Sequence, residues 1–276
     1  MPTMPTMPTT PTTPTTPTMQ TAPTARTRRT FATLLVMLTR STLREPVGLF
    51  FTLILAPLLV AVLGVLFGND PSPQFGGRGF MDATLPACAC LVVGMTGIII
   101  LPTNQLQLRE SGALTRLRAT PLSPRVFVAA DLTVNFLISM VGIVLALLVG
   151  ALGFGVRLQG SPLAVLAAAA LGLVAFLALG YMLAAVYPSS RAATGVGNGL
   201  FIVIMMTSGA FVPQSQIPQG VQRVARYSPF HYLVDLLQGM WAGRSWTDYG
   251  TALAVLVGMT VICGLLGARL FRWKTA

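Results

Sequence analysis

The residues that could do chemistry are few in this sequence, and their spacing does not form a catalytic site. The single histidine, His231, has no cysteine or second histidine near it. Cys88 and Cys90 form C-A-C, which is neither a zinc-binding nor a redox spacing, and they lie in a hydrophobic stretch, where a thiol behaves as a small apolar side chain. The only lysine is Lys274, so the sequence has no GxxxxGK[ST] loop for a nucleotide. We predict a non-catalytic chain that binds no metal and no cofactor of its own.

The densest group of charged residues is the segment RESGALTRLRATPLSP at 109–124. If it continues as a helix from Leu106 at about 100° per residue, Leu106, Ala113, Leu114 and Leu117 share one face, and Glu110 projects from the middle of that face. No basic residue stands three or four positions after Glu110. A carboxylate on an apolar face needs a partner, which another helix or another subunit would supply. Alternatively, the segment is a short amphipathic loop on lipid headgroups, and Glu110 reaches water.

Composition places these residues in a membrane protein. The chain has 276 residues, of which 54% are hydrophobic and 9% are charged, whereas soluble domains have roughly 25% charged residues. Six stretches are long and apolar enough to cross a hydrocarbon core of about 30 Å as helices. We predict spans at about 47–67, 84–103, 132–155, 163–187, 192–212 and 249–271. Pro57 should kink the first of them.

The basic residues predict the orientation. With the N-terminus in the cytoplasm, the outside segments hold only Arg78, Arg157, Arg223, Arg226 and Arg244, and the remaining basic residues are inside. The positive-inside rule favours this arrangement, with both termini cytoplasmic. The net charge of +11 then indicates contact with anionic lipid headgroups rather than with nucleic acid. The first residues, almost entirely proline and threonine, predict a disordered tail over 1–27.

Small residues in the predicted spans allow close helix packing. Gly64 and Gly68 have GxxxG spacing, as do Gly195 and Gly199, and either pair could pack within the chain or at a subunit interface. No acid lies at the middle of a predicted span, and Asp131 lies just outside the third. Carriers driven by protons or sodium usually keep an ionisable group at mid-depth, so this placement weakens the secondary-transporter hypothesis.

Three features resemble the permease subunits of type-2 ABC exporters, especially the daunorubicin/doxorubicin-resistance permeases. ESGALTRLRATP at 110–121 is similar to the family's E-x-G-x-L-x-R-L-x-x-[ST]-P loop. GAFVP at 209–213, IP at 217–218 and SPFHYLVD at 228–235 resemble its external stretch before the last span. The third feature is the order of the elements, an amphipathic N-terminal helix followed by six spans.

The resemblance implies an all-α integral membrane domain over 28–274 with six transmembrane helices. An interfacial amphipathic helix at 29–44 would have Phe31, Leu34, Leu35 and Leu38 on its apolar face. A short external helical region would precede the last span. The loop after the second span would be a cytoplasmic coupling helix resting on a separate ATPase subunit, which would bind ATP and Mg. The coupling residues would be Arg109, Glu110, Leu114, Arg116, Leu117, Arg118 and Pro121.

The resemblance also implies a multi-pass protein of the plasma membrane that exports a hydrophobic or amphipathic small molecule, such as a drug, an antibiotic or a lipid. The path would lie between two copies of the permease, which would form a homodimer, along the second and fifth spans. Candidate lining residues are Thr96, Asn198, Phe201, Met205, Met206 and Phe211. The alternatives are export of a glycan or lipid-linked polymer by the same machinery, a secondary transporter, or a membrane scaffold that transports nothing.

Overall fold

The computed structural model describes residues 23–71, 77, 79–113, 124–156, 158–208, 220, 223 and 227–270. Apart from an isolated bridge between Pro71 and Gly79, none of these residues pairs in a sheet, and the elements are helices. The first are α1 (Pro23–Leu43), α2 (Pro46–Leu49), η1 (Phe50–Ile54) and α3 (Leu55–Phe67). Next come α4 (Phe80–Met95), η3 (Thr96–Ile100), α5 (Leu101–Glu110) and α7 (Pro124–Phe154). The last are α8 (Pro162–Val186), α9 (Ser190–Thr207), α11 (Pro229–Trp241), η5 (Trp246–Tyr249) and α12 (Gly250–Leu270).

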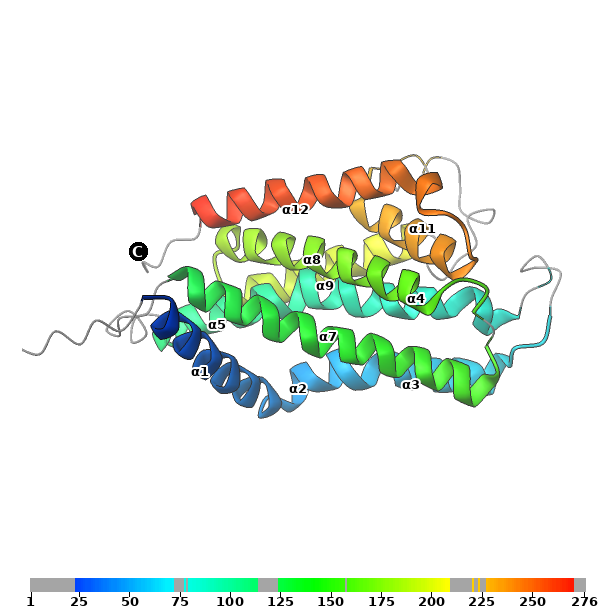
Figure 1. Ribbon diagram of the computed structural model, residues 1–276, viewed down its shortest axis with the longest axis horizontal. Coiled ribbons are helices and arrows are strands. Elements are labelled where there is room, and N and C mark those ends of the chain that lie inside the picture. The colour runs from blue at the N-terminus through cyan, green and yellow to red at the C-terminus, as the bar shows by residue number, and fades with distance from the viewer. Residues whose placement is uncertain are drawn as a thin grey trace, which may run out of the picture.

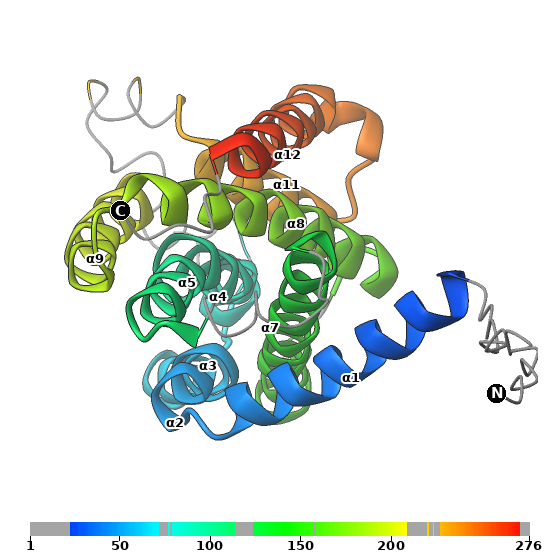
Figure 2. The same ribbon diagram turned by 90° about the vertical axis from the view of Figure 1, so that its left-hand side faces the viewer.

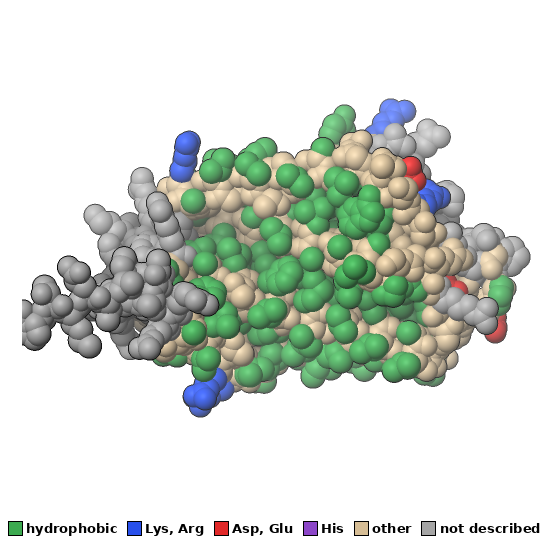
Figure 3. Space-filling view, viewed as in Figure 1, with side chains coloured by type: hydrophobic (Ala, Val, Ile, Leu, Met, Phe, Trp, Pro, Cys, Tyr) green, Lys and Arg blue, Asp and Glu red, His purple; other side chains and the backbone are tan. Residues whose placement is uncertain are grey.

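The long helices run side by side in one bundle (Figure 1). α5 and α12 end, and α7 and α9 begin, on the same side, which is the left of Figure 1 and is called here the Glu110 end. Hydrophobic side chains cover the middle of the face shown in Figure 3, and its coloured charged side chains lie toward the two ends of the bundle. This distribution suits a molecule whose middle is surrounded by lipid tails and whose ends reach the headgroups.

Five of the described helical stretches are long and apolar enough to span a membrane: Phe50–Phe67, Phe80–Glu110, Val126–Phe154, Pro162–Val186 and Trp246–Leu270. They coincide with five of the six spans expected from the sequence. The remaining expected span, 192–212, falls on α9, whose 18 residues begin at Ser190 and are less apolar than the other five stretches. The second span also extends past its expected end at Thr103, because the helix continues through a polar turn to Glu110.

The expected disturbance at Pro57 takes the form of a widened helical turn. Proline has no N–H and its ring clashes with the carbonyl group four residues earlier. In η1, just before Pro57, the helix opens into π geometry, and the N–H of Leu55 donates to the carbonyl oxygen of Phe50. The same happens in η3 before Pro102, where the N–H of Leu101 donates to Thr96. Both π turns therefore accompany a proline in the following turn.

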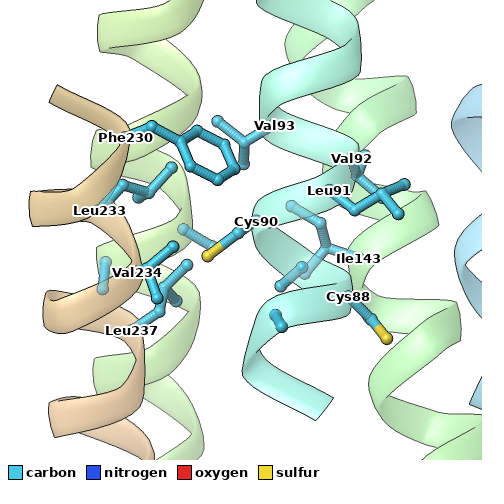
Figure 4. Packing of buried hydrophobic residues seen from close by; sticks show 14 of the residues in the cluster. Cys88, Cys90, Leu91, Val92, Val93, Ile143, Phe230, Leu233, Val234 and Leu237 are labelled. Atoms are coloured by element: carbon cyan, nitrogen blue, oxygen red, sulfur yellow. The ribbon is translucent and has the colours of Figure 1, made fainter. Parts of the chain in front are cut away.

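The helix formed by α4, η3 and α5 is the centre of the bundle. α4 is buried over almost its whole length, and Figure 4 shows Phe230 and Val234 of α11 on one side of it and Ile143 of α7 on the other. Cys88 and Cys90 of α4 are free thiols within this apolar packing, in keeping with their sequence context. Since lipid provides no hydrophobic force between helices, the close packing of α4 against its neighbours depends on complementary shape and on small residues.

A close crossing joins η3 to α8 through Gly97 and Gly180. A Cβ atom on Gly97 would lie 2.5 Å from the carbonyl oxygen of Phe176, and one on Gly180 would lie 2.6 Å from the carbonyl oxygen of Gly97. Both obstacles are backbone atoms, which cannot move aside as a side chain can. The two glycines therefore fix how closely α8 approaches the central helix.

α1 packs its expected apolar face toward the bundle. Leu34 is buried, and Phe31, Leu35 and Leu38 are half-buried, whereas Val36 on the opposite side is 50% exposed. The packing partner is α7. α1 begins at Pro23, inside the segment assigned from the sequence to the disordered tail, so the boundary between tail and helix lies earlier than expected.

Candidate functional site

Two of the polar contacts between helices that are distant in sequence involve a carboxylate, and both lie at the Glu110 end. The first joins the end of α5 to the start of α9. One carboxylate oxygen of Glu110 accepts a hydrogen bond from the backbone N–H of Ser190 at 2.7 Å, and the other accepts from the Ser190 hydroxyl at 2.6 Å. Hydrogen bonds to an ionised carboxylate are short and stronger than neutral ones, and a negative charge is favoured at a helix N-terminus.

This contact resolves the question of the partner of Glu110. The partner is another helix of the same chain, as one of the two expectations required, and the residue that binds the carboxylate is Ser190 of α9. Glu110 is also exposed, so its carboxylate reaches water, as the alternative expectation had it. The sequence contained no local signal for this contact, because Ser190 lies 80 positions away.

The continuous helix expected from Leu106 to Leu117 is wrong. The α-helix ends at Glu110, the N–H of Ser111 closes on the carbonyl of Gln107, and Gly112 has a φ of 69°. Glycine is the residue that adopts a positive φ at a helix end without steric cost, so ESG is a helix stop. Of the other expected coupling residues, Arg109 is half-buried in the last turn of α5. The rest, Leu114, Arg116, Leu117, Arg118 and Pro121, lie outside the described residues.

The second contact is a buried polar cluster between α5, α7 and α8. One carboxylate oxygen of Asp131 accepts hydrogen bonds from Tyr181 Oη at 2.6 Å and from Gln105 Nε2 at 2.8 Å. The amide of Gln105 also donates to Tyr181 Oη at 3.2 Å. Asp131 is 8% exposed, Tyr181 is 6% exposed and Gln105 is 2% exposed. We call these three residues the Asp131 cluster.

The Asp131 cluster corrects the sequence interpretation. Asp131 was placed just outside the third span, whereas it lies inside α7 and is buried against two other helices. A helical stripe could have revealed it, because Phe127, Ala130 and Val134 are buried at the spacing that puts Asp131 on the same face. Ionisable groups inside membrane bundles are costly and are usually functional. Asp131 lies near the start of α7 rather than at the middle of the span, so it does not supply the mid-depth acid that carriers usually have.

The residues expected to line a substrate path do not share one surface. Thr96 is buried, and its hydroxyl lies 3.0 Å from the hydroxyl of Ser139 on α7. Phe201 and Met205 are buried toward the core of the bundle. Asn198 and Met206 are exposed on the outer side of α9, and Phe211 lies outside the described residues. Of the five candidates that the structure describes, Asn198 and Met206 face the surroundings of the single chain.

The two glycine pairs also differ in surroundings. A Cβ atom on Gly64 would lie 2.4 Å from the ring of Phe154, so Gly64 packs against α7 within the chain. Gly68 ends α3 with a φ of 63°. Gly195 and Gly199 on α9 have no atom of another residue close to where a Cβ would be, so this pair faces open space.

Among the side chains that the structure describes, no three histidine, cysteine or acidic residues lie together in a way that could hold a metal ion. Of the two polar contacts, only the Asp131 cluster is enclosed by protein. The contacts can therefore fasten helices to one another, transmit movement between them and bind protons.

Comparison with protein families identifies the type of membrane protein. The model of the family described as ABC-2 type transporter matches residues 29–241, which run from within α1 to the end of α11 and include both polar contacts. No curated protein matches the chain. Because the family model covers well over half of the sequence, it establishes membership. The chain is thus a multi-pass membrane protein of the ABC-2 type transporter family, the membrane permeases of ABC transporters.

Proposed function

We propose that the chain is the permease subunit of an ATP-driven exporter for a hydrophobic or amphipathic small molecule. The match to the ABC-2 type transporter family over residues 29–241 is the observation that supports this most strongly. A separate ATPase subunit would bind ATP and Mg and supply the energy. The resemblance of residues 110–121 to the loops of drug-resistance permeases supports the choice of substrate class.

In this proposal the Glu110 end faces the cytoplasm, both termini are cytoplasmic, and the membrane is the plasma membrane. α9 would be the fifth of six spans, completed by residues beyond Thr207, and α1 would lie in the membrane interface. The chain after Glu110, from Leu114 to Pro121, would rest on the ATPase, with apolar contacts from its leucines and register from Arg116 and Arg118.

The experiment that tests the function is transport by purified components. The chain is reconstituted into vesicles alone, with its ATPase, and with its ATPase carrying a substitution that abolishes ATP hydrolysis. We expect extrusion of an amphipathic fluorescent drug only with the active ATPase and ATP. Transport by the chain alone, driven by a proton or sodium gradient, would instead establish the secondary transporter.

We expect two copies of the chain to meet through α9. Its exposed side carries Gly195, Gly199 and Val196, the last 56% exposed, whereas Gly64 is already occupied within the chain by Phe154. Small residues permit the close approach that drives helix association in lipid. Val196→Cys should therefore form a disulfide-linked dimer when native membranes that contain it are treated with a thiol oxidant.

The matched control for this cross-link is Ala193→Cys, one turn away on the buried side of α9. It should remain monomeric under the same oxidation. The homodimer would be contradicted if neither Val196→Cys nor cysteines at neighbouring exposed positions, such as Val203 and Met206, cross-linked while the protein still transported with its ATPase.

A further inference from the structure

α9 packs mainly along the central helix of α4, η3 and α5, and its last turns also meet α11, where the rings of Phe201 and Phe230 lie 6.5 Å apart. The hydroxyls of Thr194 and Thr103 lie 3.2 Å apart, and a Cβ atom on Gly197 would lie 3.0 Å from the carbonyl oxygen of Ile98. Farther along, Phe201 lies against Gly94. Positions on α9 rise as those on the central helix fall, so the two helices run antiparallel. Figure 2 shows α9 at the edge of the bundle beside α4 and α5.

The other side of α9 has little protein contact. Ile202 and Val203 are each 60% exposed, and Val196 and Met206 are more than half exposed. A helix held from one side can shift with its neighbour without displacing a helix on its far side. Its position therefore depends on how firmly it is joined to the central helix.

Glu110 and Ser190 join the end of α5 to the start of α9. Both oxygens of one carboxylate hold one residue, at 2.6 and 2.7 Å, through a hydroxyl and through the backbone itself. A bond to the backbone of the first residue of α9 holds the helix rather than only a side chain. Ser189 caps the same helix independently, since its hydroxyl accepts from the N–H of Ala192 at 3.2 Å. The helix start therefore does not depend on Glu110.

We propose that Glu110 and Ser190 act as a latch that makes α9 move with the end of α5. This inference rests on the proposed function, in which the chain after Glu110 rests on the ATPase. When ATP binding displaces that part of the chain, the carboxylate pulls the start of α9 with it, and α9 changes its position at the surface between the two copies. Glu110 and Ser190 are positioning residues in this mechanism. Ser190 is needed to move α9 even though it lies outside the segment that would rest on the ATPase.

The decisive variant is Ser190→Pro. Proline is well tolerated at the first position of a helix, where its missing N–H costs nothing to the helix itself. Ser189 is already extended, with φ −153° and ψ 160°, as a residue before proline must be. The substitution therefore removes both hydrogen bonds to Glu110 while it preserves α9. Glu110→Ala removes the same two bonds from the other side.

Both variants are reconstituted with the ATPase, and ATP hydrolysis and drug transport are measured together. We expect ATPase binding and hydrolysis close to wild type, with the number of molecules transported per ATP reduced about tenfold, a typical size for coupling between sites. The double variant should be no worse than either single one, because both break the same contact. Spin labels at Gln107 and Arg191, both exposed, should report a broader distribution of distances between α5 and α9 in each variant.

Asp248→Asn, an exposed acid at the opposite end, is the control and should transport as wild type does. Normal transport per ATP in Ser190→Pro would overturn the latch and leave the proposed function intact. Loss of ATPase binding in Glu110→Ala but not in Ser190→Pro would also overturn it, since Glu110 would then touch the ATPase directly. Failure of the proposed function would look different, because the wild-type complex would not transport with ATP.

Discussion

Gly180→Ala is expected to destabilise the bundle by about 1–3 kcal/mol, although alanine is the better helix former. The added methyl group would meet the carbonyl oxygen of Gly97 and a methyl group of Leu101, each at 2.6 Å. α8 would have to move away from η3, and that movement would also displace Tyr181, the next residue, from Asp131. Thermal unfolding of the purified protein in detergent measures the effect as a lower midpoint.

The matched control is Gly264→Ala in α12. Gly264 has no neighbouring atom close to where its Cβ would be, so the same substitution there should leave the midpoint unchanged or raise it. If both alanine variants unfolded at the wild-type temperature, the close crossing of α8 and η3 would not be a determinant of the fold.

Asp131→Ala is expected to lower the free energy of unfolding by about 1–3 kcal/mol for each buried donor that loses its acceptor. The carboxylate of Asp131 accepts from both Tyr181 and Gln105, and no side chain replaces it in a cluster that is closed to water. Asp131→Asn keeps one acceptor oxygen and removes the buried charge, so its loss of stability should be smaller. The midpoint of thermal unfolding and drug transport are the measurements.

Asp235→Ala provides the comparison for Asp131, because Asp235 is exposed on α11. Surface substitutions usually change stability by less than about 0.5 kcal/mol. Equal stability of the alanine variants at 131 and 235 would show that the Asp131 cluster does not hold α5, α7 and α8 together.

The helices of the bundle could be predicted from sequence because long apolar stretches have few structures available to them in lipid. Their ends were less predictable. The second span was expected to end at Thr103, yet the helix continues through Asn104, Gln105 and Gln107 to Glu110. Gln105 is compatible with the span because other helices enclose it, whereas Gln107 is exposed at the Glu110 end. Hydropathy treats each residue as if it faced lipid, so it ends an enclosed helix too early.

The candidate site was predictable only in part, because its two contacts are not local. Glu110 was singled out for its missing partner, and the need for a partner could be inferred from the charge alone. The identity of that partner, Ser190, depends on how α9 packs, which the sequence pattern does not encode. The Asp131 cluster was missed because its members lie in three helices, and each alone resembles an ordinary polar residue near a membrane interface.

The burial of the three thiols makes the natural protein convenient for chemical labelling. Cys88, Cys90 and Cys263 are all free and buried within the bundle, so water-soluble maleimides should react slowly with the folded chain. A single cysteine placed on an exposed position, such as Arg191 or Gln107, would then be the main site of modification. Fluorophores and spin labels could be attached to the protein with its own cysteines in place, and a rise in background labelling would report that the helices around α4 have come apart.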